Sequence, residues 1–222
     1  MPRLFSYTVR YDDGAGPNPF RGMCTLAICK PVIRLKAVVG DWVVGLGSAH
    51  SPSGDLRGRM VYAMRVDQVI SLRDYDRLAP EYWASRIPNL TSPVIADRLG
   101  DCIYDFSTGA PVQRPGMHGP THMATDLSGQ NVLISRHYFY FGANAISLPE
   151  HLRPLLHQTQ SHKVKANEPF VQPFVDWVRS LGVEPNHLYG WPDNLPAFIA
   201  QRESGIVGRA TASAAVSDQL PK

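Results

Sequence analysis

The stretch "AVVGDWVVGLGSAH", residues 37–50, places a Gly-Asp pair and a tryptophan directly before an apolar, β-branched run. Gly and Asp favour turns, because Gly adopts positive φ angles without strain and the Asp side chain bonds nearby backbone groups. The run that follows has high strand propensity. We therefore predict that Gly40 and Asp41 turn the chain into a strand. Trp42 is expected to pack in the core, and Ser48 to open onto a candidate ligand site.

Segments on both sides of this stretch also have strand patterns. Residues 3–11 are rich in β-branched and aromatic side chains, and "GRMVYAMRVDQVIS" alternates with a period of two. "NVLISRHYFYFG" is a further strand region. We expect one curved sheet to contain strands near residues 4–11, 42–47, 59–70 and 131–141.

Helical patterns are fewer. Residues 71–86 form a candidate helix with Ser71 as N-cap and Pro80 interrupting it, and residues 168–182 form another. Residues 87–130 are rich in Pro, Gly, Thr and Asp, a composition typical of irregular segments that carry function. Strands and helices do not alternate regularly, which disfavours a doubly wound parallel sheet. The predicted fold class is α+β, a small mixed curved sheet or barrel flanked by helices.

Composition describes an ordinary globular protein. Of the 222 residues, 44% are hydrophobic and 18% are charged, and the net charge of +3 points to no particular partner. No apolar stretch approaches the roughly 20 residues that cross a bilayer, and no secretory leader is recognisable. We expect a cytoplasmic protein with no membrane partner. Residues 1–203 are predicted to form a single domain, and the Ala/Ser-rich residues 204–222 a flexible C-terminal tail.

The cysteines and histidines give no clear site. Three cysteines are too few for a disulfide scaffold, and Cys24 and Cys29 lie far along the chain from His118 and His122. That spacing is a poor match to zinc sites, and nothing in the sequence marks an activated thiol. Buried structural cysteines and loop histidines are the favoured interpretation, so no metal, no cofactor and no catalytic residue is assigned.

A ligand site is better indicated by "DDGAGPNPF", residues 12–20, and by "CKPVIR", residues 29–34. The first combines a Gly/Pro-defined loop shape with two carboxylates and an amide. The second spaces two cations four residues apart, either as solvated ends or as phosphate contacts. With the aromatic strand near residues 137–141, the candidate ligand-binding residues are Asp12, Asp13, Asn18, Lys30, Arg34, Ser48, His137 and Tyr140.

These stretches together resemble a known family. "YDDGAGPNPFRGMCTLAICKPVIRLKAVVGDWVVGLGS", "GRMVYAMRVDQVIS" and "VLISRHYFYFG" are similar, in this order, to the second class of nucleotide modification associated domains. That resemblance implies association with systems that modify DNA bases, and it transfers no catalytic residue. "VVGDWVVGLGS" with its returning strand also resembles PUA-like domains such as EVE, ASCH and YTH, which are small barrels that bind nucleic acid or modified bases.

Two functions are therefore the main expectations from the sequence. One is recognition of a nucleotide or modified base, with nucleic acid or a nucleotide as partner, where stacking and base-edge hydrogen bonds give selectivity and cations contact phosphate. The other is an enzyme acting on nucleotides or nucleic acid, with Asp12 or Asp13 and a histidine as an acid–base pair. A small-molecule or protein-binding module is a third possibility. The oligomeric state is not indicated.

Overall fold

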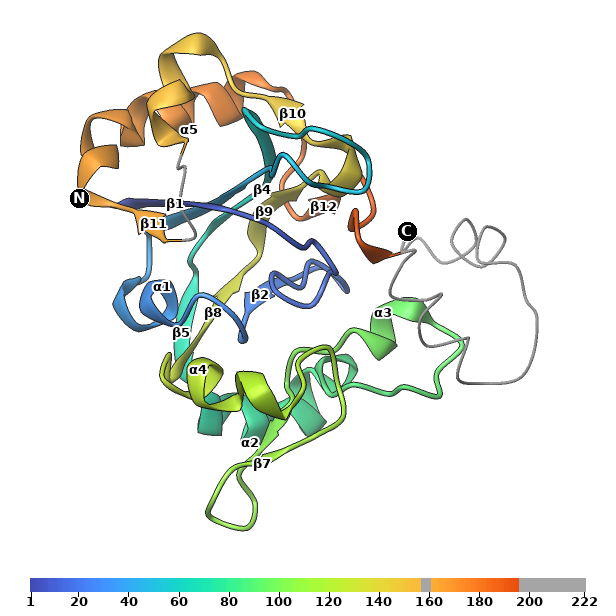
Figure 1. Cartoon of the computed structure of the whole chain (residues 1–222). Coiled ribbons are helices and arrows are strands. Elements are labelled where there is room, and N and C mark those ends of the chain that lie inside the picture. The colour runs from blue at the N-terminus through green and yellow to red at the C-terminus, as the bar shows by residue number, and fades with distance from the viewer. Residues whose placement is uncertain (157–160, 196–222) are drawn as a thin grey trace.

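A computed structural model describes residues 1–156 and 161–195 of the chain (Figure 1). Its main sheet has seven strands in these residues, in the order β11-β1-β3-β4-β9-β12 with β10 paired to β4. The pair β1 and β3 is parallel, whereas β3, β4 and β9 are successively antiparallel. The strands are β1 (Leu4–Thr8), β3 (Trp42–Leu46), β4 (Arg59–Arg65), β9 (His137–Tyr140), β10 (Ile146–Ser147), β11 (His162–Lys163) and β12 (His187–Leu188).

Strand β3 is the apolar run of the stretch at residues 37–50, and it is buried on both faces. Trp42 and Val44 pack in the core on one side of the sheet, and Val43 packs in the core on the other side. Gly45 has no room for a side chain, because a Cβ there would lie 2.3 Å from the Tyr62 ring. Burial on both faces explains why this strand is a continuous apolar run and not an alternating one.

The turn before β3 is as predicted. Gly40 has a φ of 91°, and the buried Asp41 carboxylate accepts hydrogen bonds from the backbone N–H of Val38 and of Arg3. The Arg3 side chain binds the same carboxylate at 2.6 Å. Asp41 therefore joins the turn to the N-terminal strand, and Trp42 is a core residue at 5% exposure.

A second, three-stranded sheet corrects the expectation of one sheet. It is ordered β2-β8-β5 and contains β2 (Cys24–Leu26), β5 (Gln68–Ser71) and β8 (Asn131–Ser135). The two predicted strands at 59–70 and 131–141 are a long antiparallel ribbon that bends at Asp67 and Arg136. At the bend the Asp67 carboxylate accepts the backbone N–H of Arg136 at 2.6 Å. One half of the ribbon joins each sheet.

Two of the helices cover the outer sides of the two sheets. The α-helices are α1 (Pro31–Lys36), α2 (Leu72–Tyr82), α3 (Ile95–Arg98), α4 (Met123–Leu127) and α5 (Val171–Ser180). Short 3-10 helices are η1 (Ala84–Arg86), η2 (Pro120–His122), η3 (Gly142–Asn144), η4 (Glu150–Leu155) and η5 (Lys165–Phe170), and β6 (Tyr104–Asp105) pairs with β7 (Val112–Gln113). Helix α5 packs on the main sheet through Phe174 and Val178, whereas α2 packs on the second sheet through Leu72 and Tyr75 (Figure 1).

Helix α2 begins as expected, because the Ser71 hydroxyl accepts the backbone N–H of Asp74 at 2.9 Å. Pro80 lies inside this helix without ending it, which differs from the expected interruption. The final residues of the candidate helix, from Ala84 to Arg86, form the separate helix η1.

The α+β class is confirmed, with mixed sheets and several helices. The main sheet does not close into a barrel, because β11 and β12 are its two edges in the described residues. Among the helices of residues 1–156 and 161–195, none is long and apolar enough to cross a membrane. The predicted tail at 204–222 lies outside the described residues.

A buried arginine fixes the loop that follows β1. Arg86, which is 1% exposed, donates to the carbonyl oxygens of Phe20 and Met23, to Asn18 and to the Thr25 hydroxyl. Thr25 in turn donates to the buried Asp101 carboxylate. This network holds the Gly/Pro-rich loop against the second sheet.

We expect Arg86→Met to lower the free energy of unfolding by about 3 kcal/mol, because the substitution leaves several buried acceptors without their donor and removes the positive charge near the buried Asp101 carboxylate. Urea denaturation measures the change. Arg57→Met removes only an exposed ion pair with Asp55 and should leave the midpoint unchanged. Equal midpoints for the two variants would contradict this account.

Candidate functional site

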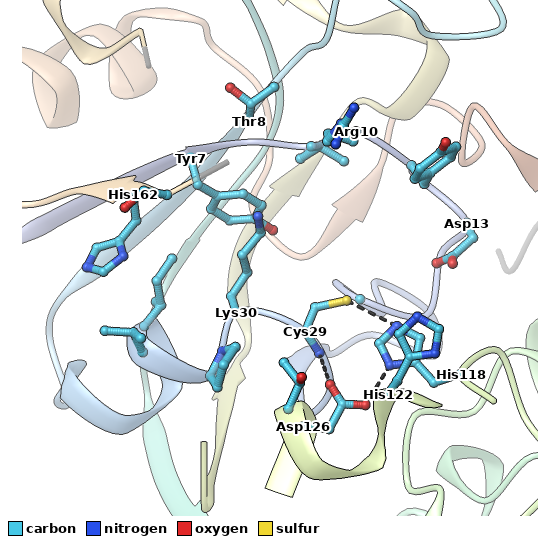
Figure 2. Close-up of a pocket in the computed structure, with 18 of the residues that line it drawn as sticks. Tyr7, Thr8, Arg10, Asp13, Cys29, Lys30, His118, His122, Asp126 and His162 are labelled. Atoms are coloured by element: carbon cyan, nitrogen blue, oxygen red, sulfur yellow. Dashed lines mark hydrogen bonds and ion pairs between the residues drawn. The ribbon is translucent and has the colours of Figure 1, made fainter. Parts of the chain in front are cut away.

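A pocket of about 600 Å³ opens between the end of β1, the turn before α1 and the segment that precedes α4. Its walls come from residues 7–11 and Asp13, from Cys29 to Ile33, from Ser161 and His162, and from five residues of the segment at 117–126, namely Met117, His118, His122, Thr125 and Asp126. Figure 2 shows Cys29 and His118 facing one another on one side of this pocket and Lys30 extending toward Tyr7 on the other. The volume lies within the ~300–1,000 Å³ typical of small-molecule sites.

Cys29 lies in a strand–turn–helix unit, between β2 and α1. Cys29 and Lys30 have φ angles of 59° and 40°, in the left-handed region that side chains with a Cβ disfavour. Such a conformation costs roughly 1–3 kcal/mol per residue and persists only where the surroundings hold it. Here the Asp126 carboxylate accepts the backbone N–H of Cys29, and Arg34 donates to its carbonyl oxygen, each at 2.8 Å.

The side chains of Cys29, His118 and Asp126 form a continuous series of contacts. The Cys29 Sγ lies 3.2 Å from His118 Nε2, and His118 Nδ1 lies 2.5 Å from Asp126 Oδ2. The same carboxylate oxygen accepts the Tyr104 hydroxyl at 2.9 Å. The carboxylate therefore fixes both the imidazole and the backbone of the cysteine that the imidazole faces (Figure 2).

The charges of this group follow from its hydrogen bonds. Burial alone would lower the pKa of His118, but its bonds to Asp126 and Cys29 outweigh burial and raise the pKa from 6.5 to about 10. Burial opposes the charge of Asp126, yet bonds from His118, from the Cys29 N–H and from Tyr104 hold the pKa of its carboxyl below the ordinary value. At neutral pH an imidazolium therefore faces the sulfur atom.

Arg34, a predicted ligand residue, lies beneath the pocket. It is completely buried, and its guanidinium donates to the carbonyl oxygens of Cys29, Asp126 and Asn131. Gly129 is packed directly against this guanidinium, where a Cβ would lie 2.5 Å from Cζ. The Arg34 side chain thus positions the cysteine turn and does not line the pocket.

Lys30 is a predicted residue that does line the pocket, and Arg10 also lines it. Lys30 Nζ lies 4.4 Å from the centre of the Tyr7 ring. Burial lowers the pKa of Lys30, and the positive charge of Arg10 lowers it further. Within the described residues, neither cation forms an ion pair with a carboxylate.

Asp13 is the other predicted residue that lines the pocket. Burial raises the pKa of Asp13, while its carboxylate accepts the backbone N–H of Ala15. It enters from the loop after β1, on the side of the two histidines (Figure 2). His122 stacks on His118, with ring centroids 4.4 Å apart.

The other predicted residues lie elsewhere. Asp12 and Tyr140 bind one another in the core, and Asn18 is a buried partner of Arg86. Ser48 accepts a bond from His50 within its own loop, and His137 packs against Trp42. The 12–20 loop thus supplies Asp13 to the pocket, and its remaining polar side chains support the fold.

The sequence interpretation missed the group of Cys29, His118 and Asp126. A usable signal was Pro31, because proline favours the first turn of a helix and so places Cys29 in a strand-to-helix turn. No local pattern identifies its partners, because His118 is separated from Cys29 by 89 positions. No cluster of His, Cys, Asp and Glu in residues 1–156 and 161–195 is arranged to hold a metal ion.

We expect the stability contributed by the His118–Asp126 pair to depend on pH in a defined direction. The raised pKa of His118 gives a contribution that is complete below about pH 6.5 and is lost as the pH rises toward about 10. The lowered pKa of Asp126 gives one that is present above about pH 3.8 and is lost in acid.

The measurement is the difference in free energy of unfolding between the wild type and His118→Gln, by urea denaturation across this range. The difference should be largest between about pH 4 and 6.5 and smallest near pH 10. A difference that does not change with pH would show that no ion pair forms.

The profile of one protein family, described as Nucleotide modification associated domain 2, matches residues 1–197. The match contains the whole pocket, and its description indicates association with nucleotide modification systems. No curated protein and no solved structure matches the chain, so the resemblance to PUA-like domains stays a prediction. The match over most of the sequence confirms the family resemblance: the chain belongs to the nucleotide modification associated domain 2 family.

Proposed function

We propose that the pocket binds a single nucleotide, with its phosphate at Lys30 and Arg10 and its base toward Asp13. The observation that carries the proposal is the pair of neighbouring cations at the pocket, neither of which has a carboxylate partner in the described residues. Two positive charges that line the same pocket repel one another. An anion bound between them offsets this electrostatic repulsion and accepts charge-assisted hydrogen bonds from both.

The opposite side of the pocket suits a nucleobase. The Asp13 carboxylate can accept hydrogen bonds from an exocyclic amino group, and the stacked imidazoles of His118 and His122 offer a flat surface. A volume of about 600 Å³ suits one nucleotide and not a duplex. Family membership supports a nucleotide or a modified base as the ligand.

The alternative function, an enzyme with an acid–base pair of a histidine and an aspartate, has a candidate counterpart at this pocket. The aspartate in direct contact with a histidine there is Asp126, which binds His118, and not Asp12 or Asp13. Asp12 is bound to Tyr140 away from the pocket lining.

We expect Lys30→Met and Arg10→Met each to weaken binding of nucleoside 5′-monophosphates by about tenfold or more, because a charge-assisted hydrogen bond contributes about 1.5–3 kcal/mol. The affinity for the matching nucleosides, which have no phosphate, should stay the same. Isothermal titration calorimetry gives both affinities.

Arg57→Met is the matched control, because Arg57 is an exposed arginine that does not line this pocket. If Lys30→Met weakens nucleosides and nucleotides equally, the phosphate is not at Lys30. If the wild type binds none of the mononucleotides, including those with modified bases, the proposal fails.

Asp13→Asn tests the base end of the pocket. Because the amide also presents N–H donors, the preference among the bases should change, while the gain in affinity from the phosphate should persist. The same calorimetric titrations, repeated with each base, measure both quantities. An unchanged order of base preference would remove Asp13 from the base site.

A further inference from the structure

We infer that Cys29 is a nucleophile that cleaves an acyl group from a nitrogen atom of the bound nucleotide, with His118 as its proton carrier. The nucleotide part of this inference rests on the proposed function, whereas the thiol chemistry stands on the geometry of Cys29, His118 and Asp126. Neither the family description nor the sequence motifs assign a catalytic residue to this chain.

Among the cysteines, only Cys29 lines the pocket. Cys24 and Cys102 are fully enclosed at 0% and 2% exposure, and burial raises the pKa of both thiols far above the ordinary value. A thiol must become a thiolate to attack a substrate, so these two are inert. The positive charge of His118, 3.2 Å from Sγ, provides the environment that a thiolate requires at Cys29.

Asp126 is a positioning residue. Its Oδ2 holds His118 Nδ1, which directs Nε2 at the sulfur, and its Oδ1 holds the backbone N–H of Cys29. Nucleophile, base and orienting carboxylate thus stand in the order that acyl-transfer enzymes use on unrelated folds. Gln113 further fixes the histidine by donating to its backbone carbonyl at 2.6 Å.

The geometry favours acyl transfer because this reaction needs a proton carrier beside the sulfur. With the proton already on His118 Nε2, the Sγ thiolate of Cys29 bonds to the carbonyl carbon of an amide on the nucleotide. The C–N bond then breaks, and the proton moves from His118 to the leaving nitrogen. An acyl thioester remains on Cys29.

Water completes the cycle. His118 takes a proton from a water molecule, the water oxygen bonds to the acyl carbon, and the C–S bond breaks to restore the thiolate. The products are a carboxylic acid and an amine, so the sum is hydrolysis of an amide by one water molecule. No oxidant, reductant or further co-reactant is consumed.

The first test of this inference uses p-nitrophenyl acetate as the acyl donor. The wild type should release a burst of p-nitrophenolate equal to the enzyme concentration and gain the mass of one acetyl group on the Cys29 peptide after acid quenching. Cys29→Ser should abolish both. His118→Ala should slow acetylation by about 100-fold or more, the size typical for loss of a general acid–base group.

Cys102→Ala is the matched control, because Cys102 is a buried thiol outside the pocket, and it should behave as the wild type does. Acetylation of Cys29 at the same rate in the wild type and in His118→Ala would overturn the inference, as would absence of an acetyl group from Cys29. For Asp126→Asn, NMR of the ring protons should show a lower pKa of His118, and the pH profile of Cys29 acetylation should shift with it, which a purely structural role would not produce.

The second test uses cytidine and adenosine 5′-monophosphates that are acylated on the exocyclic amine. The wild type should release the free amine, whereas Cys29→Ser should bind these nucleotides with unchanged affinity and not cleave them. Binding without cleavage by the wild type overturns the inference and leaves the proposed function intact. Acetylation of Cys29 by p-nitrophenyl acetate without nucleotide binding supports the thiol chemistry and contradicts the proposed function. A thioether between Cys29 and an intact base would also overturn acyl transfer.

Discussion

The site depends above all on one buried guanidinium. Arg34, from helix α1, binds the backbone carbonyl oxygens of Cys29, Asp126 and Asn131, and so connects the cysteine turn, helix α4 and the start of β8. A fully buried charge is stable only where its donors are satisfied, and a planar arginine can satisfy several carbonyl groups at once. Because Gly129 leaves space for the guanidinium, the three segments can approach closely. This contact holds helix α4, which carries Asp126, against the cysteine turn, and the bond from the Cys29 N–H to the Asp126 carboxylate reinforces it.

The strained turn at Cys29 and Lys30 is a second consequence of the same packing. Two successive residues in the left-handed region direct the thiol toward His118 and the ammonium group toward Tyr7 (Figure 2). The strain is offset by hydrogen bonds to the N–H and the carbonyl oxygen of Cys29. This turn thereby places the thiol on one side of the pocket and the Lys30 cation on the other. An acylated nucleotide would need this arrangement, with its acyl group at the thiol and its phosphate at the cation.

The two sheets place these groups in a common pocket. Strand β3 fixes the main sheet, because it is buried on both faces and pairs with β1 and β4. The ribbon that bends at Asp67 and Arg136 carries the chain from this sheet to the second one, where β8 pairs with β2 just before the cysteine turn. The pocket lies beside the end of β1 and the cysteine turn that follows β2, so residues from distant parts of the sequence line it.

The sequence by itself determined the α+β class, the turn at Gly40 and Asp41, the position of most strands and the family, because these follow from local propensity, hydrophobic pattern and distinctive motifs. Lys30 and Asp13, two of the residues predicted to bind a ligand, line the pocket in the structure, and their role there stays a prediction. Only the tertiary structure decided that Arg34 is buried and that the long strands bend into two sheets, since both depend on contacts between segments far apart. The pairing of Cys29 with His118 has the same origin: one residue follows a strand, the other lies in an irregular segment, and packing alone brings them within 3.2 Å.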